Sequence, residues 1–238
     1  MNLLGAVQGP AFFWEGLTYL PSVCILATMG RSSKEKALRT REKILARALD
    51  LFASRGFEHV SFSDIGKSLH LSKGAVYWHF KNKEVLLVEL VKQALLRLKA
   101  RLALQQKEIN SLAQLEEYYV LLVKVIIEDE FLLKFLKVVY RMAWLPGILA
   151  SVKQEACQVM LCPEEVSLLI LDRLKRENKI RLSLEVADVV HVVECFVGGL
   201  LNFYLTHPED KKNERILDYL KIGLRSIFKG FQQESAYE

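Results

Sequence analysis

The chain consists of long stretches with helical hydrophobic spacing, separated by short breaks, and this pattern predicts an all-α protein. Apolar side chains recur three and four positions apart over residues 37–55 and 83–104, which gives each stretch one apolar face. The same spacing predicts helices over residues 111–127, 128–143, 147–160, 163–178, 184–206 and 209–231. No segment combines strand alternation with turn residues, so we expect no sheet.

Two short helices are predicted between the first two long ones. Gly56 follows the last turn of the first helix, where a glycine commonly ends a helix. Ser61 and Asp64 have the spacing of a capping box, which predicts a helix start. His70-Leu71-Ser72 interrupts this helix, and a second one runs from Lys73 to Phe80. Residues 61–80 therefore form a helix-turn-helix unit, which packs on a neighbouring helix and projects its second helix outward.

The second short helix has one apolar face and one aromatic, polar face. A helical wheel turns Val76 and Phe80 inward and places a second set on the outside or beside it: Gly74, Ala75, Tyr77, Trp78, His79 and Lys81. An exposed Tyr-Trp-His set is costly in water unless a partner covers it. The phosphates and base edges of a DNA groove would do so. Spacing alone leaves open the alternative that Tyr77 and Trp78 are core residues of an ordinary bundle.

Charge is distributed unevenly along the chain. Residues 31–103 carry 16 Lys and Arg against 7 Asp and Glu, whereas residues 104–238 carry 17 against 20. A basic, structured segment points first to nucleic acid. The alternative is a solvated basic face with no specific partner.

The run TREKILARALDLFASRGFEHVSFSDIGKSLHLSKGAVYWHFKNKEVLLVELV resembles the DNA-binding domain of the TetR family along its whole length. Its most specific part, SKGAVYWHFKNKEVL, is similar to the signature of the TetR and acriflavine-resistance repressors. The resemblance covers residues 38–98. It implies an N-terminal three-helix domain with a helix-turn-helix, joined by a long helix to a C-terminal helical domain over residues 105–238 that senses a ligand and dimerises.

The resemblance also implies roles for individual residues in binding double-stranded operator DNA. Ser61 and Ser63 begin the first helix of the motif near the DNA backbone, and Thr40 reaches a phosphate from the preceding helix. The recognition helix enters the major groove with Ser72, Lys73, Gly74 and Ala75. Phosphates and bases are then contacted by Tyr77, Trp78 and His79, and a further phosphate by Lys83.

Residues 118–144 are dense in apolar and aromatic side chains. A filled core is one interpretation, and an apolar ligand cavity between helices is the other. Because the resemblance implies sensing of an unknown small-molecule effector here, the predicted ligand-binding residues are Tyr119, Phe131, Phe135, Tyr140 and Trp144.

The last two predicted helices carry long apolar stripes, and Ser183 is a plausible N-cap for the first of them. Gly198-Gly199 inside that helix would permit close approach of another helix. Together with the resemblance, this predicts a homodimer interface formed by Val192, Phe196, Gly199, Phe203, Leu220 and Leu224. Packing wholly within one chain is the alternative.

Candidate chemistry is otherwise sparse. The four cysteines form no CxxC pair, and the sequence has no glycine-rich phosphate loop or nucleophile motif. His191 and Glu194 lie three apart on a helix, as two ligands of a metal site could. We interpret them as an ordinary interior or surface pair, because no further ligand is evident in the sequence. We therefore expect no enzyme activity, no cofactor and no metal.

Residues 1–28 contain apolar runs but no Lys or Arg. The positive n-region of a signal peptide is absent, and Pro10, Glu15 and Pro21 interrupt the apolar run that a membrane span needs. We interpret residues 1–28 as an extension from an upstream start, outside the working fold, and expect a cytoplasmic protein with no membrane partner.

These observations together predict a homodimeric repressor that a small, apolar ligand releases from its operator. Two alternatives remain: a ligand-binding module whose helix-turn-helix lacks operator specificity, and an activator of the same type.

Overall fold

The computed structural model describes residues 31–106, 109–142, 163–208 and 215–232, together with residues 147, 150 and 154. Within these residues the secondary structure is helical, and the only strand-like feature is an isolated bridge between Leu182 and Gln232. The prediction of an all-α protein is thus confirmed. The interpretation of residues 1–28, the position of Trp144 and most of the helix predicted over 147–160 lie outside the described residues.

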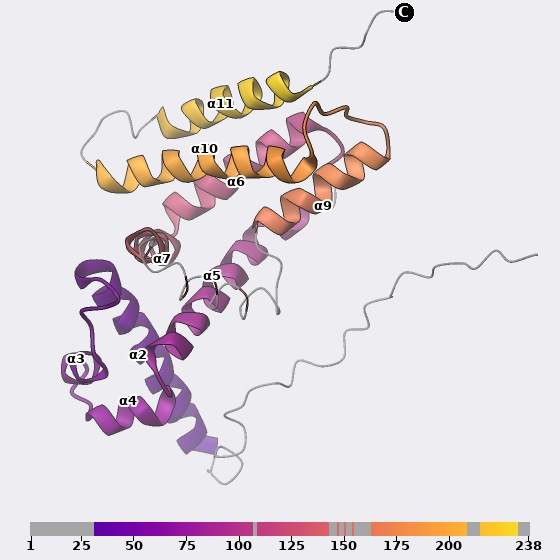
Figure 1. The fold of residues 1–238 in the computed structure, drawn as a ribbon. Helices are drawn as coiled ribbons and strands as arrows, with labels where there is room; N and C mark the ends of the chain where they lie inside the picture. Colours follow the sequence, from indigo (N-terminus) through magenta and orange to yellow (C-terminus); the bar gives the residue numbers. More distant parts are fainter. Residues whose placement is uncertain are drawn as a thin grey trace, which may run out of the picture. The chain divides into compact units, whose positions relative to one another are not determined.

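The helices follow the predicted order (Figure 1). They are α2 (Arg31–Arg55), α3 (Phe62–Ser68), α4 (Lys73–His79), α5 (Lys83–Gln106), α6 (Leu112–Glu128), α7 (Glu130–Arg141), α9 (Pro163–Arg176), α10 (Val186–Thr206) and α11 (Ile216–Phe231). The chain divides into two units, residues 1–41 and 42–238. The described part of the first unit is the start of α2, and the packing below is that of the second.

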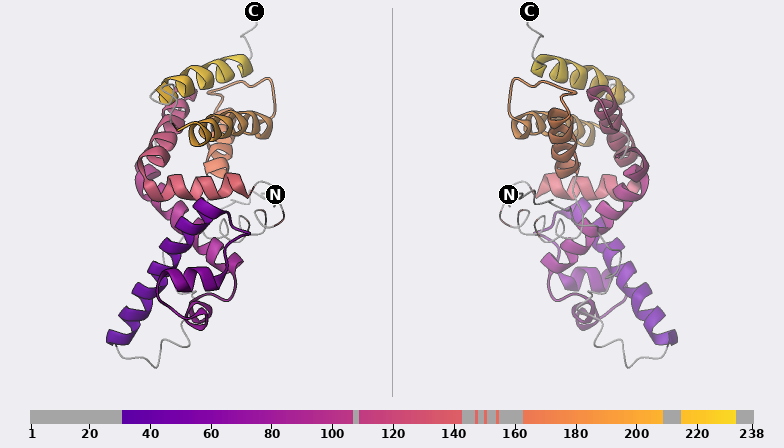
Figure 2. Two further views of the ribbon diagram at one scale, coloured as in Figure 1. Left: turned by 90° about the vertical axis from the view of Figure 1, so that its left-hand side faces the viewer. Right: turned by 90° about the vertical axis from the view of Figure 1, so that its right-hand side faces the viewer.

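Two hydrophobic cores form in the second unit. The first is built from α2, α3, α4 and the start of α5, around Ile44, Phe52, Ile65 and Val76. The other fills the space between α6, α9, α10 and α11. In Figure 1, α10 and α11 run side by side, and both views of Figure 2 place α11 at the end of α6 that is farther from α3 and α4.

Helix α7 belongs to both cores. Val138 and Met142 are buried in the first core, although they lie far from it in sequence. Phe131 and Phe135 pack against both cores. The helix is also tied to α2 by polar contacts, since Lys134 Nζ lies 2.7 Å from Asp50 Oδ1 and the Arg141 guanidinium donates to the Ala53 carbonyl at 2.7 Å. The three-helix region predicted over 38–98 is therefore completed by α7.

One predicted helix end is confirmed and one is not. Gly56 ends α2 as predicted, with φ of +92° and its N–H bonded to the Phe52 carbonyl. Ser183 is not the N-cap of α10, because the helix begins at Val186 with Glu185 before it. The Ser183 N–H and hydroxyl instead bond the carbonyl of Phe231, which anchors this loop to the end of α11.

Candidate nucleic-acid interface

Helix α3 begins at a complete capping box. The Ser61 hydroxyl accepts a bond from the Asp64 N–H at 3.2 Å, and the Asp64 carboxylate accepts one from the Ser61 N–H at 2.8 Å. The Ser61 hydroxyl and backbone bonds hold the pKa of Asp64 below its usual range. The capping box that the sequence predicts is confirmed, and it fixes the direction in which the chain enters the helix-turn-helix.

The turn between the two short helices depends on Gly66. The Leu71 N–H bonds the Gly66 carbonyl at 2.8 Å, and His70 between them takes a left-handed φ of +56°. A Cβ added at Gly66 would lie only 2.8 Å from the Leu71 carbonyl oxygen. The turn folds back so closely on α3 that only glycine fits there without displacing backbone.

The faces of α4 resolve the alternative that spacing left open. Val76 and Phe80 are buried at 0% and 1% exposure, whereas Tyr77 and Trp78 are 50% and 49% exposed. Ser72 caps the helix by accepting from the Ala75 N–H at 3.1 Å. Tyr77 and Trp78 are thus surface residues of this chain, as the wheel predicts, and not core residues.

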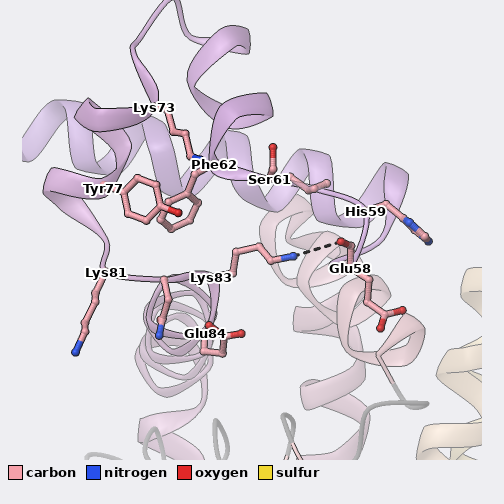
Figure 3. Close-up of a pocket in the computed structure, with 11 residues that line it drawn as sticks. Glu58, His59, Ser61, Phe62, Lys73, Tyr77, Lys81, Lys83 and Glu84 are labelled. Atoms are coloured by element: carbon pink, nitrogen blue, oxygen red, sulfur yellow. Dashed lines mark hydrogen bonds between the residues drawn. The ribbon is translucent and has the colours of Figure 1, made fainter.

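A shallow pocket of about 380 Å³ lies between the starts of α3 and α5 and the exposed face of α4 (Figure 3). Tyr77 and Phe62 meet edge to face on its wall, with ring centroids 4.9 Å apart. The ammonium of Lys73 lies 5.6 Å from the Tyr77 ring centroid. The walls also include Lys81 and Lys83. The carboxylates of Glu58 and Glu84 also line the pocket, which therefore combines aromatic rings with three cations and two anions, and the excess of positive charge suits an anionic polymer.

Lys83 has a structural task that the sequence did not reveal. Its ammonium donates to the carbonyls of Phe57 and Glu58 at 2.8 and 3.4 Å, and it lies 4.6 Å from the Phe57 ring centroid. It therefore holds the loop between α2 and α3 against the start of α5. An ammonium has three N–H donors, so two carbonyl bonds leave one proton for a phosphate.

Of the remaining predicted DNA-binding residues, four lie on α3 and α4 and one lies on α2. Gly74 is exposed, Ala75 and Ser63 are half-buried, and His79 is half-buried with its ring edge-on to Trp78 at 4.6 Å. Thr40 belongs to the first unit, where its hydroxyl donates to the Lys36 carbonyl of its own helix.

The sequence did not single out Phe62 or Asn82. The Asn82 side chain caps α5 by accepting from the Val85 N–H at 2.8 Å. An Asn directly before a helix was the available signal.

Of the predicted ligand-binding residues that the structure describes, Tyr119 is buried, whereas Phe131, Phe135 and Tyr140 are half-buried. Tyr119 is 1% exposed, and its hydroxyl lies 2.8 Å from Ser167 Oγ and 3.2 Å from Glu194 Oε1. Burial, followed by the charge of Glu194, raises the pKa of Tyr119. The Tyr140 hydroxyl donates to the Gly198 carbonyl at 2.6 Å, and the same two causes raise its pKa to about 12. Polar groups therefore meet in an otherwise apolar interior.

The predicted dimer residues divide into exposed and buried sets. Val192, Gly199 and Phe203 are exposed on one side of α10. Contrary to the prediction, Leu220 and Leu224 are 0% exposed and belong to the core of this chain, so their side chains do not face a partner. Ile222, which was not among the predicted residues, is 62% exposed on α11.

The glycine at the contact between α10 and α11 is Gly223. A Cβ at Gly223 of α11 would lie 2.0 Å from Cζ of Phe196, so the Phe196 ring sits directly on Gly223 of its own chain. Gly198 makes room for the Tyr140 hydroxyl, which would lie 3.4 Å from an added Cβ. At Gly199 an added Cβ would meet nothing within 4 Å.

Comparisons with known proteins agree with this geometry. Residues 44–90 match the family model of bacterial regulatory proteins, tetR family. The chain is 28% identical over 208 residues to the HTH-type transcriptional regulator AcrR of Shigella flexneri, covering 82% of this chain and 93% of that protein.

Solved structures show the same fold. NalD, the secondary repressor of the MexAB-OprM multidrug efflux pump in Pseudomonas aeruginosa, matches with a TM-score of 0.62 at 21% identity, covering 84% of this chain and 100% of that one. The triclosan complex of SmeT matches with a TM-score of 0.63 at 22% identity, covering 84% and 95%. SmeT is the repressor of the Stenotrophomonas maltophilia multidrug efflux pump SmeDEF.

These relatives are transcriptional regulators and not enzymes. The helix-turn-helix geometry, the match over residues 44–90 and the likeness of the whole helical fold lead to one conclusion: the chain contains a tetR-family DNA-binding domain and is similar over most of its length to bacterial transcriptional regulators.

Proposed function

We propose that the protein is a homodimeric repressor that binds double-stranded operator DNA through α3 and α4 and releases it when a small molecule occupies its C-terminal helices. The observation that carries the DNA-binding part is the half-exposed pair Tyr77 and Trp78 on a helix whose other face is buried. Such a pair has hydroxyl and indole donors for phosphates, and Lys73 adds a charge beside it.

The exposed face of α10 supports the homodimer. Among the described residues, α10 is the helix that would be long and apolar enough to cross a membrane, by length and composition alone. Only 33% of its most apolar stretch is buried within the chain, so much of its apolar surface is left for a partner to cover. Val192 and Phe203 remain 38% and 39% exposed, and Ile222 of the adjacent α11 remains 62% exposed. A second copy, packed as a four-helix contact, covers these side chains. Two recognition helices would then meet half-sites about one DNA turn, roughly 34–36 Å, apart.

The interior of the C-terminal helices supports the sensing step. A small apolar effector with a polar group would find partners in Tyr119, Glu194 and the Gly198 carbonyl, which already bond buried hydroxyls. Phe131 and Phe135 lie on α7, which packs against both cores. An effector that binds more tightly to one arrangement of α7 shifts the DNA-binding helices, because only differential affinity moves such an equilibrium.

The test is sequence-selective DNA binding on fragments from around the gene, measured against competitor DNA. Trp78→Ala should reduce operator affinity strongly at unchanged thermal stability, because the ring is half-exposed. Leu169→Ala on α9 is the matched control, since Leu169 is 55% exposed and lies outside α3 and α4. Binding with no preference over competitor DNA would favour a ligand-binding module without operator specificity. Increased transcription from a bound operator would favour an activator.

The sensing step has its own test at Phe135. Phe135→Ala should shift the effector concentration that releases operator and leave operator affinity near its original value. A plain core residue behaves differently: loss of a buried Phe costs about 3–5 kcal/mol and damages every activity together. Thermal unfolding, operator affinity and effector-dependent release on one preparation separate these outcomes.

A further inference from the structure

A cysteine and a histidine lie together on the exposed face of α10. Cys195 Sγ and His191 Nε2 are 3.8 Å apart on successive turns, and both residues are exposed. Zinc binds thiolate sulfur at about 2.3 Å and imidazole nitrogen at about 2.0–2.1 Å in a tetrahedron, which separates two such ligand atoms by about 3.6 Å. The pair is therefore already spaced much like two ligands of one ion.

This pair supplies half of the ligands that a structural zinc ion needs. Within the described residues of a single chain, no group of three or more His, Cys, Asp and Glu side chains could hold a metal ion. A closed zinc site has four protein ligands. The described residues of one chain therefore do not supply the two missing ligands, and another molecule is their candidate source.

The position of the pair on α10 indicates a second copy as their source. The helix spans Val186–Thr206, and Cys195 lies near its midpoint, on the exposed face between Val192 and Gly199. In a two-fold contact the residue nearest the axis meets its own copy. At Gly199 the space around the backbone is open, so two α10 helices that cross here can approach closely and bring both pairs together.

We propose that His191 and Cys195 of two copies bind one Zn²⁺ ion across the dimer contact, as a Cys₂His₂ site. The proposal rests on the homodimer of the proposed function. Each His191 ligates through Nε2 and keeps its proton on Nδ1, whereas each Cys195 loses its S–H proton, so one ion displaces two protons. An ion that binds only the dimer stabilises it by mass action, and operator affinity becomes dependent on zinc.

Cobalt serves as the spectroscopic probe in the full-length chain, with Cys24, Cys157 and Cys162 changed to Ser so that Cys195 is the only thiol. Titration of the reduced protein with Co²⁺ should produce the absorption bands of tetrahedral cobalt with thiolate ligands, saturating at one ion per two chains. Cys195→Ser and His191→Ala should each abolish the bands. His207→Ala, which removes another exposed histidine near the end of α10, is the matched control and should retain them.

Sedimentation separates this inference from the homodimer itself. Zinc at about a hundredfold over its Kd should tighten the dimer about a hundredfold, and Cys195→Ser should remove the effect. A metal-free dimer that binds operator but gives no cobalt bands overturns the zinc site and leaves the proposed function intact. Saturation at one ion per chain overturns it as well, as does a Cys195 disulfide between chains without cobalt binding. A chain that stays monomeric with and without metal overturns both proposals.

Discussion

The helix-turn-helix region and the C-terminal helices obey the same packing rules, but they differ in how local those rules are. In the first region, Ser61 and Asp64 cap α3, Gly66 admits the turn and Ser72 caps α4, each acting within a few residues of itself. In the second, three glycines of similar sequence context have three different surroundings: a phenylalanine ring at Gly223, a tyrosine hydroxyl at Gly198 and open space at Gly199. Local chemistry identifies the first set, whereas the second depends on which helix lies opposite.

Gly66→Ala tests the local region most severely. The added Cβ would lie 2.8 Å from the Leu71 carbonyl oxygen, so backbone must move. We expect a loss of unfolding free energy of about 2–3 kcal/mol, at the upper end of overpacking costs, together with loss of DNA binding. Chemical denaturation gives the first quantity and operator titration the second. Unchanged stability would show that the turn is more adaptable than its hydrogen bonds indicate.

Gly223→Ala is the corresponding change in the C-terminal helices. Here the obstacle is the far end of the Phe196 side chain, which can turn aside at the expense of its packing. We expect a smaller loss, about 1–2 kcal/mol. Gly230→Ala in the last turn of the same helix is the matched control and should keep its stability or gain up to about 1 kcal/mol from helix propensity, as nothing lies within 4 Å of its added Cβ. Equal effects of the two substitutions in denaturant unfolding would contradict the contact between Phe196 and Gly223.

Lys83→Ala and Lys73→Ala should separate structure from phosphate binding. Lys83 bonds two carbonyls of the loop before α3, so its removal should cost about 1–2 kcal/mol of stability. If its third proton reaches a phosphate, the log–log salt slope of DNA binding also falls by about one unit. Lys73 is exposed, so Lys73→Ala should lower the salt slope of DNA binding without changing stability. A stable Lys83→Ala protein with an unchanged slope would remove both roles.

Gly74→Ala concerns clearance toward DNA. An added Cβ would meet only the Ser72 hydroxyl oxygen at 3.8 Å, so the free protein should keep its stability or gain up to about 1 kcal/mol. If the start of α4 approaches base edges closely, operator affinity should nevertheless fall, by about tenfold, or about 1.4 kcal/mol. The two measurements, unfolding and operator titration, should therefore move independently. A parallel change in both would place Gly74 away from the groove.

The last expected effect concerns stability at alkaline pH. Burial and the nearby Glu194 raise the folded-state pKa of Tyr140 to about 12, above the ordinary value of 10.0. The neutral form is therefore favoured by folding, and its stabilising contribution is complete below pH 10 and is lost as the pH rises from about 10 to about 12. Tyr140→Phe should flatten this part of the stability curve. An identical alkaline decline in both proteins would show that Tyr140 does not titrate in this way.

Much of the site was predictable because its signals are short-range. The capping box at Ser61 and the inward turn of Val76 and Phe80 are confirmed by the structure. The bonds of Lys83 to Phe57 and Glu58 were not predictable, since 25 residues or more separate the partners and a surface lysine looks the same with or without them. Ser183 is not a helix cap, because α10 begins only at Val186 and the Ser183 N–H and hydroxyl donate to the distant carbonyl of Phe231.

The sequence by itself determined the helical class, the order of the helices and the face that α4 turns outward, since helix periodicity and capping depend on neighbours within about one turn. Only the tertiary structure decided that α7 completes the first core, that Leu220 and Leu224 are covered by their own chain, and that Phe196 rests on Gly223. An apolar stripe predicts that one face of a helix is buried, but it does not identify the helix that packs on it. The reason is that the free energy of burial depends on the apolar area removed from water and not on which helix covers that area.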